Sequence, residues 1–242
     1  MTKVHRVPFP KAARHIATRP LERVSTDVCG PFATLSINHE RYFCVFIDHF
    51  TNYVHVALMK HKSDFEDVFE SFFHAAQAIH QPLTLTHLHS DNAMDTTRMR
   101  KFCAANGVTQ VLTPPYSSAS NGRAERCIRT ITEAAQAMRH HTGLPPSFWS
   151  YAVMAAAYTL NHIPRSFTAG ARAPAPIELW ERFKAKNIQD LLQRLRPFGC
   201  ECVCLRSKRK KIEIKGERCV LIGYAPLSKA YFLLALESQR II

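Results

Sequence analysis

The chain has 242 residues, and its 32 Lys and Arg against 19 Asp and Glu give a formal net charge of +13. A hydrophobic content of 46% is ordinary for a globular protein and excludes a chain that is disordered throughout. The positive charge favours a polyanionic partner, most often nucleic acid, with a membrane surface or an acidic protein as lesser options.

The N-terminal half of the sequence predicts strands and helices that alternate. Residues 1–20 are basic and contain three prolines, which indicates an extended arm. Three segments rich in β-branched and aromatic residues predict strands, the last two of them as a hairpin: 21–30, 41–50 and 52–60. The apolar spacing then predicts a helix over 62–80, a strand over 83–91, a helix over 96–107 and a short strand over 108–113.

The C-terminal half begins with two predicted helices, over 121–141 and 145–163, and then changes in composition. A Pro/Ala-rich linker and a short helix precede three strand-like pieces. We therefore predict an α/β fold, a mixed sheet flanked by helices, followed by a small β-rich module. The expected divisions are a basic arm (1–20), a core (21–165), a linker with a short helix (166–190) and the β-module (191–242).

Three carboxylates are candidates for a metal site. Asp27 lies inside the first predicted strand, where an acid is costly unless it is paired or bound to a metal. Asp91 ends the fourth strand, and Glu125 lies in the first turn of the helix over 121–141. If the first and fourth strands are neighbours, all three converge, and their mutual repulsion requires cations. Oxygen ligands select Mg²⁺ or Mn²⁺.

Structural roles compete for these and other acids. Asp91 is equally suited to cap a turn or helix, and Glu125 could form an intrahelical ion pair with Arg129. Asp48 suits a turn cap after the second strand, and Asp95 could support the metal site from its periphery.

Three cysteines near the C-terminus could pack in a core or bind a metal. Cys200, Cys202 and Cys204 alternate and would share one face of a strand, packed in a core rather than bound to a metal. The eight cysteines form no CxxC pair, which favours a reduced intracellular protein, and no segment is long and apolar enough for a signal peptide or a membrane span. The basic run at 206–218 is equally suited to a solvated hairpin face and to a DNA contact, with a nuclear-import signal as the lesser alternative. No phosphate loop of the GxxxxGK[ST] type is present, so ATP is not expected as a partner.

Several motifs together resemble the integrase core of copia-type LTR retrotransposons, from about residue 4 to the C-terminus. They are STDVCGP (25–31), YFCVFIDHFTNYVHVALMKHKSD (42–64), LHSDN (88–92), NGRAER (121–126), LPPSFWSYAVMAAAYTLNHIP (144–164), RPFGCECV (196–203) and CVLIGY (219–224).

The resemblance implies an RNase H-like core whose metal triad is Asp27, Asp91 and Glu125, with two Mg²⁺ or Mn²⁺ ions when DNA is bound. The implied reaction is polynucleotidyl transfer: water attacks near the 3′ end of the element DNA, and the freed 3′-OH attacks target DNA. DNA and further copies of the chain are the expected partners, and the nucleus is the expected place of action. The residues expected to bind DNA are Asn121, Arg123, Arg126, Arg129, Lys208, Arg209, Lys210 and Lys211.

Departures from the family pattern keep a second hypothesis open. The sequence starts at a segment that in the family follows an N-terminal zinc module, so we expect that module to be missing. Ala93 replaces a glycine, which predicts backbone strain, Asp95 replaces a glutamate, and Ser118, Ala119 and Ser120 stand where glutamines are common. The alternative is a domesticated, catalytically impaired protein that binds nucleic acid or protein.

Overall fold

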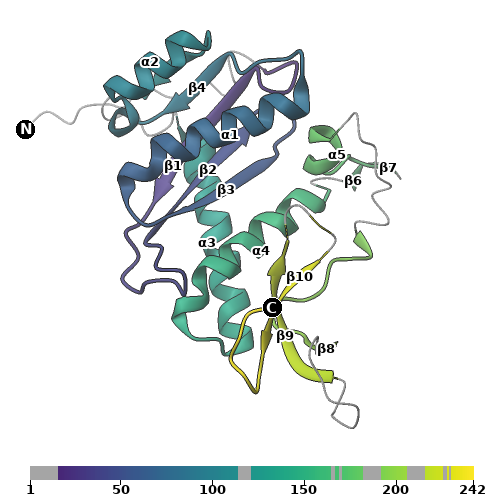
Figure 1. Ribbon diagram of the computed structural model, residues 1–242. Coiled ribbons are helices and arrows are strands. Elements are labelled where there is room, and N and C mark those ends of the chain that lie inside the picture. The colour runs from purple at the N-terminus through teal and green to yellow at the C-terminus, as the bar shows by residue number, and fades with distance from the viewer. Residues whose placement is uncertain are drawn as a thin grey trace, which may run out of the picture.

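The computed structural model describes residues 16–113, 121–164, 167–168, 171–181, 192–205, 216–225, 228 and 230–242. Five strands form its main sheet: β1 (Arg23–Cys29), β2 (Tyr42–Asp48), β3 (Val54–Met59), β4 (His87–Ser90) and β5 (Thr109–Leu112). Their order is β3-β2-β1-β4-β5 (Figure 1). β1 to β3 pair antiparallel, whereas β4 runs parallel to β1, and β5 runs parallel to β4. The sheet is therefore mixed, as predicted.

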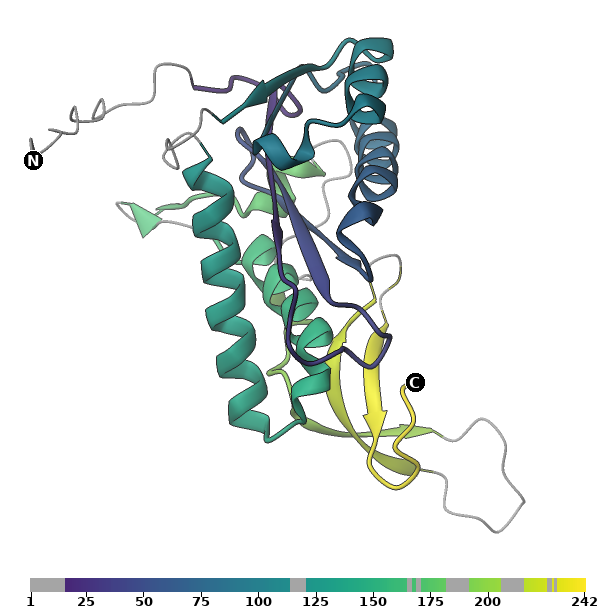
Figure 2. The ribbon, with the colours of Figure 1, turned by 90° about the vertical axis from the view of Figure 1, so that its left-hand side faces the viewer.

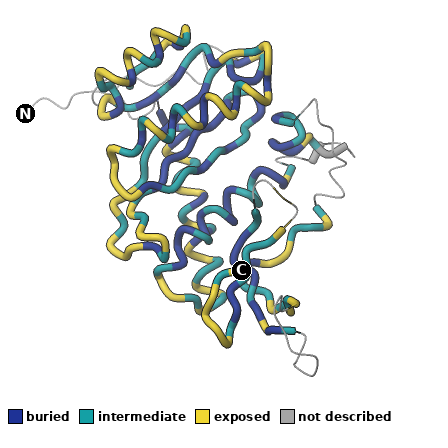
Figure 3. The backbone as a smooth tube through the Cα atoms, viewed as in Figure 1, coloured by how far each residue is buried: buried dark blue, intermediate teal, exposed yellow. Residues whose placement is uncertain are grey.

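Helices cover both faces of the sheet, which Figure 2 shows edge-on. One face carries α1 (Phe65–His80) and α2 (Thr97–Ala105), and the other carries α3 (Gly122–Thr142) and α4 (Trp149–His162). Two hydrophobic clusters fill the two interfaces, and Figure 3 shows the strands between them as mostly buried. The predicted mixed sheet flanked by helices is confirmed.

Alternation along β1 decides which of its side chains face α3. Val24 and Val28 pack with the cluster beneath α1 and α2, while Cys29 packs with the cluster beneath α3 and α4. Because successive side chains of a strand point to opposite faces, Asp27 shares the α3 face with Cys29. An acid thus stands inside a strand, at a helix-covered face.

The C-terminal module is a three-stranded antiparallel sheet in the order β10-β9-β8. Its strands are β8 (Glu201–Leu205), β9 (Gly216–Tyr224) and β10 (Tyr231–Ala235). Ile222 and Leu234 are buried in the same cluster as the α4 side chains, and Tyr224 stacks on Tyr158 of α4 at 4.0 Å between ring centroids. The module therefore shares a hydrophobic core with the helix layer. Burial alternates along β8, with Cys202 and Cys204 half-buried on one face, as predicted.

The linker includes β6 (Phe167–Thr168), β7 (Ala171–Arg172) and α5 (Pro176–Trp180). Trp180 is 3% exposed, stacks on Tyr53 at 4.5 Å and meets His80 edge-on at 4.4 Å. This tryptophan anchors α5 against the core on the α1 side. No helix in the described ranges is long and apolar enough to cross a membrane.

Three predictions for acids and their neighbours have clear outcomes. Asp48 is confirmed as a turn cap: its Oδ1 accepts hydrogen bonds from the Thr51 N–H and hydroxyl, both at 2.7 Å, and its Oδ2 accepts one from Leu21 N–H at 2.9 Å. Asp95 instead pairs with Arg100 through two hydrogen bonds at 2.7 and 2.6 Å. Ala93 lies in a 3-10 turn and is not among the positive-φ residues, so the expected strain there is wrong.

We predict that Asp48→Ala lowers the free energy of unfolding by about 2 to 4 kcal/mol, because it leaves buried N–H groups without acceptors. Chemical denaturation measures this change. Asp95→Ala is the matched control, since its ion pair lies at the surface, and it should leave the unfolding midpoint nearly unchanged. Equal effects of the two substitutions would contradict the assigned role of Asp48.

Candidate functional site

Asp27 and Asp91 lie level with each other on neighbouring parallel strands. Ser25 of β1 pairs in register with His89 of β4, and each stands two residues before one of the acids. Asp91 directly follows β4 and precedes the 3-10 turn Asn92–Met94. Two neighbouring interior strands therefore hold the carboxylates near the carboxyl end of β4, and carboxyl ends of strands are a usual place for ligands in α/β sheets.

Glu125 approaches the pair from the helix layer. It lies in the first turn of α3, which packs against β1 and β2, and its side chain is exposed. Among the described residues the structure records no ion pair between Glu125 and Arg129, the alternative expected from the sequence. Glu125 is close enough to Asp27 for their charges to repel.

The environment of Asp27 raises its pKa from 3.8 to about 6. Burial is the main cause, and repulsion from Asp91 and then Glu125 adds to it. The Val28 N–H donates to Asp27 Oδ1 at 2.8 Å and acts in the opposite direction, favouring the charged form. A positive ion between the acids would remove the repulsion.

The three acids fit a hard divalent cation in their donor chemistry. Their oxygens are the ligands that Mg²⁺ and Mn²⁺ prefer, and Oδ1 of Asp91 is buried without a hydrogen-bond partner. Within the described ranges, however, no three such side chains stand close enough to hold a metal ion. The three carboxylates have to come closer together before they can bind one ion.

Two contacts fix the start of α3 on the sheet, both made by residues that precede Glu125 in the chain. Asn121 is 3% exposed and donates from Nδ2 to the Thr26 carbonyl at 3.1 Å, next to Asp27. Arg123 donates from Nη1 to the His49 carbonyl at 2.9 Å. These anchors set how far Glu125 lies from Asp27. The sequence reasoning expected DNA contacts from Asn121 and Arg123 and missed this structural role.

A polar cluster lies beside the aspartates on the same face. Ser25 Oγ and His49 Nε2 are 2.7 Å apart, and the His49 and His89 rings lie 5.7 Å apart. Burial, helped by nearby Arg23, lowers the pKa of His89 to about 4. Burial and then Arg123 lower the pKa of His49 to about 3, so both rings are neutral at pH 7. The sequence did not predict this cluster. A signal for it was present, because side chains two residues apart on a strand share a face: Ser25 shares one with Asp27, and His89 shares one with Asp91.

Of the other residues predicted to bind DNA, two lie on α3 and the rest fall outside the described residues. Arg126 and Arg129 are exposed on α3 and remain candidates for DNA contact. Lys208, Arg209, Lys210 and Lys211 lie outside the described residues, as do Ser118, Ala119 and Ser120.

The predicted thiol face of β8 continues onto β9. Cys204 Sγ lies 3.3 Å from Sγ of the buried Cys219, and the two thiols form no disulfide. The pKa of Cys219 is raised to about 11, mainly by burial, so this thiol is protonated at pH 7. No metal-binding cluster that includes these thiols occurs in the part of the chain that the structure describes.

We predict that Asp27→Asn stabilises the metal-free protein at pH 7 by about 1 to 2 kcal/mol, allowing for solvent screening of this part-exposed group. The unfolded chain loses the Asp27 proton near pH 4, whereas the folded protein keeps it until about pH 6. Wild-type stability therefore falls as the pH rises through this window, and the variant avoids that loss. Thermal unfolding between pH 4 and pH 8 with a chelator measures the difference, which should vanish at pH 4. Glu133→Gln, at an exposed acid of α3, is the control, and a pH-independent gain for Asp27→Asn would contradict the raised pKa of Asp27 as the cause.

We predict that Asn121→Ala weakens Mn²⁺ binding by about 10-fold or more, because Glu125 loses its positioning contact. Isothermal titration calorimetry measures this affinity. Asn106→Ala removes a comparable amide–carbonyl bond, to Phe102 at 2.9 Å, far from the acids and should leave Mn²⁺ affinity unchanged. A loss of stability in both variants with equal Mn²⁺ affinity would show that Asn121 is only a structural residue.

Known protein families match both the predicted core and the predicted C-terminal β-module. Residues 17–118 match the family described as Integrase core domain, and residues 200–242 match the Retroviral polymerase SH3-like domain. The Retrovirus-related Pol polyproteins from transposons RE2 and RE1 of Arabidopsis thaliana are each 30% identical over 243 residues, covering 100% of this chain. The Pol polyprotein from transposon TNT 1-94 of Nicotiana tabacum is 31% identical over 244 residues, covering 99%. The chain spans only 16% to 18% of the length of these relatives.

Solved structures support the fold. The simian T-cell lymphotropic virus intasome, solved in complex with PP2A regulatory subunit B56 gamma, contains a chain that matches with a TM-score of 0.57 and 16% identity. The match covers 98% of this chain and 83% of that chain. At this identity the likeness shows the fold alone, and the predicted RNase H-like architecture with a C-terminal β-module is confirmed. Residues 17–118 therefore belong to an integrase core domain and residues 200–242 to a retroviral SH3-like domain, and the relatives of the chain include Pol polyproteins of copia-type plant transposons.

Proposed function

We propose that the chain is a metal-dependent polynucleotidyl transferase that processes the 3′ ends of retrotransposon DNA and joins them to target DNA. The observation that carries this proposal is the placement of Asp27 and Asp91, level on neighbouring parallel strands, with Glu125 on the helix that covers them. The similarity to integrase core domains supplies the reaction class.

Three acids would bind the metal, and two residues at the start of α3 would position one of them. Asp27, Asp91 and Glu125 would hold Mg²⁺ or Mn²⁺, which supplies nucleophile activation and charge neutralisation in phosphodiester chemistry. Asp27 must be deprotonated to act as a ligand, and its raised pKa means that it binds a cation in competition with a proton. Asn121 and Arg123 hold the start of α3, and with it Glu125, against the sheet beside Asp27.

DNA would lie across the exposed side of α3. Arg126 and Arg129 are exposed there, close in sequence to Glu125, and can neutralise phosphates without reading sequence. The net charge of +13 supports the same assignment. The proposal includes assembly with further copies of the chain on element ends and target DNA, and action in the nucleus.

A domesticated, catalytically impaired protein is the second candidate. Two observations favour it: no three acids in the described ranges stand close enough to share one metal ion, and Asp95 is paired with Arg100. Such a protein would keep the basic surface and bind nucleic acid or protein without strand transfer.

Mn²⁺-dependent joining of a labelled duplex with a free 3′-OH to a supercoiled plasmid separates the two candidates. The wild-type protein should join the duplex, and Glu125→Gln should reduce joining by at least about 100-fold while DNA binding stays unchanged. Asp95→Asn is the matched control at a nearby acid and should remain active. If wild type and Glu125→Gln both bind the duplex and neither joins it, the transferase proposal fails and the second candidate is supported.

A further inference from the structure

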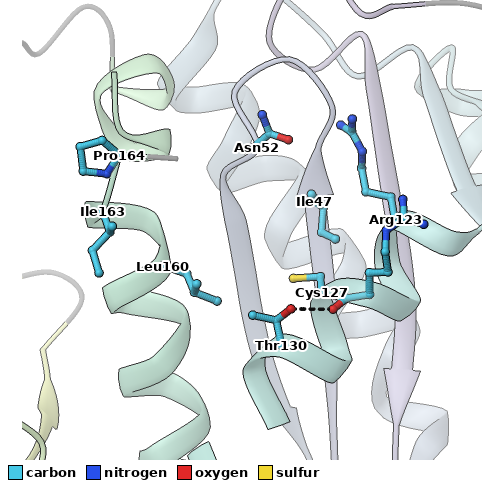
Figure 4. Close-up of a pocket in the computed structure, with 9 residues that line it drawn as sticks. Ile47, Asn52, Arg123, Cys127, Thr130, Leu160, Ile163 and Pro164 are labelled. Atoms are coloured by element: carbon cyan, nitrogen blue, oxygen red, sulfur yellow. Dashed lines mark hydrogen bonds between the residues drawn. The ribbon is translucent and has the colours of Figure 1, made fainter. Parts of the chain in front are cut away.

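A cavity of about 570 Å³ opens between the start of α3 and the end of α4 (Figure 4). Leu160, Ile163 and Pro164 form the wall on the α4 side, and Ile47 of β2 contributes from the sheet between the two helices. The remaining lining residues are Asn52, Arg123, Arg126, Cys127 and Thr130. Its volume is in the range of ligand pockets in proteins, about 300 to 1,000 Å³.

This cavity is separate from the triad of acids. Arg123, Cys127 and Thr130 are spaced by four and three residues, so they share one side of α3. Glu125 lies two residues after Arg123 and therefore points about 200° away around the helix. One side of α3 serves the carboxylates, and the other forms the cavity wall.

Both walls are held in place without a ligand. The α3 wall is tied to the sheet by the Arg123 bond to the His49 carbonyl. The α4 wall is tied to β3 by Asn161, whose Oδ1 accepts from Val54 N–H at 2.9 Å and whose Nδ2 donates to the Val54 carbonyl at 2.7 Å. A cavity between two anchored walls is formed before binding, which lowers the entropic cost of taking up a ligand.

The lining combines positive charge with an apolar floor. Among the described residues that line the cavity, Arg123 and Arg126 are the charged ones, and none is an acid. Ile47 is 2% exposed at the floor, whereas Ile163 is 45% exposed at the rim, so a ligand could remove apolar surface of Ile163 from water. A guanidinium recognises a planar carboxylate through paired hydrogen bonds.

We propose that this cavity binds an organic carboxylate whose acid group is attached to an apolar body. The carboxylate contacts Arg126 at the cavity wall, and the apolar body covers Leu160 and Ile163. Inorganic phosphate lacks the apolar part, and a phosphodiester backbone leaves the floor uncovered. A small aliphatic or aromatic acid and an acidic side chain next to a bulky apolar residue of a peptide share this chemistry.

The test uses the full chain with labelled isoleucine methyl groups and 4-phenylbutyrate as the probe. The NMR signals of Ile47 and Ile163 should shift on titration, while that of Ile131, in the core under α3, should not. Arg126→Gln should weaken binding by about tenfold or more, because it removes a charge-assisted hydrogen bond. Arg129→Gln, an exposed arginine of the same helix outside the cavity, is the matched control and should bind the probe like wild type.

Further ligands test the need for the carboxylate and for the apolar body separately, and they distinguish a small organic acid from a peptide. The amide 4-phenylbutyramide should bind at least about tenfold more weakly than the acid, and inorganic phosphate should not shift Ile163. Thr130→Trp, at an exposed lining position, should abolish the shifts by filling the cavity. The blocked dipeptide N-acetyl-Phe-Glu-amide tests the peptide source, and tighter binding than that of 4-phenylbutyrate would assign a protein partner.

Three results would overturn the proposal. They are the absence of shifts at Ile47 and Ile163 with saturating 4-phenylbutyrate, equal binding of the amide and the acid, and shifts produced by a DNA duplex but not by 4-phenylbutyrate. The last result would make the cavity part of the DNA surface. None of these measurements depends on strand-transfer activity, so the outcome is independent of the proposed function.

Discussion

The parallel pairing of β1 and β4 is the contact on which the candidate site depends. The three N-terminal strands form an antiparallel meander, and β4 joins it by pairing with β1 after the α1 crossover. This register places Asp91 level with Asp27, and a slip by one residue would turn Asp27 or Asp91 to the other face. The position of α3 then decides the third acid, because Asn121 binds the carbonyl of Thr26, the residue before Asp27.

The site carries an electrostatic cost that the rest of the fold must offset. Burial and neighbouring acids raise the pKa of Asp27 to about 6, and Oδ1 of Asp91 is buried without a partner. Functional sites commonly contain such unfavourable groups, and the surrounding core stabilises them. In this protein the sheet lies between two hydrophobic clusters, and the neutral His49 and His89 add no positive charge beside the aspartates.

α3 and α4 link the sheet, the cavity and the β-module. Where α3 starts and α4 ends, each helix is tied to the sheet by a side-chain bond to backbone, and the cavity lies between them. α4 also contributes to the core shared with β9 and β10, where its Tyr158 stacks on Tyr224 of β9. Contact between the catalytic-core fold and the β-module therefore runs mainly through α4, whereas the proposed DNA contact lies on the exposed side of α3.

The sequence alone determined the element order, the mixed sheet with helices on both faces, and the candidacy of Asp27, Asp91 and Glu125, because periodicity and costly placement of acids are local signals. It also determined Asp48 as a turn cap, since the acid precedes its own turn. Only the tertiary structure decided that Asn121 and Arg123 bind the sheet, that Asp95 pairs with Arg100, and that Ala93 is unstrained. The hydrogen bonds of Asn121 and Arg123 reach β1 and the turn after β2, 95 and 74 positions away, and no local pattern encodes contacts between such distant segments.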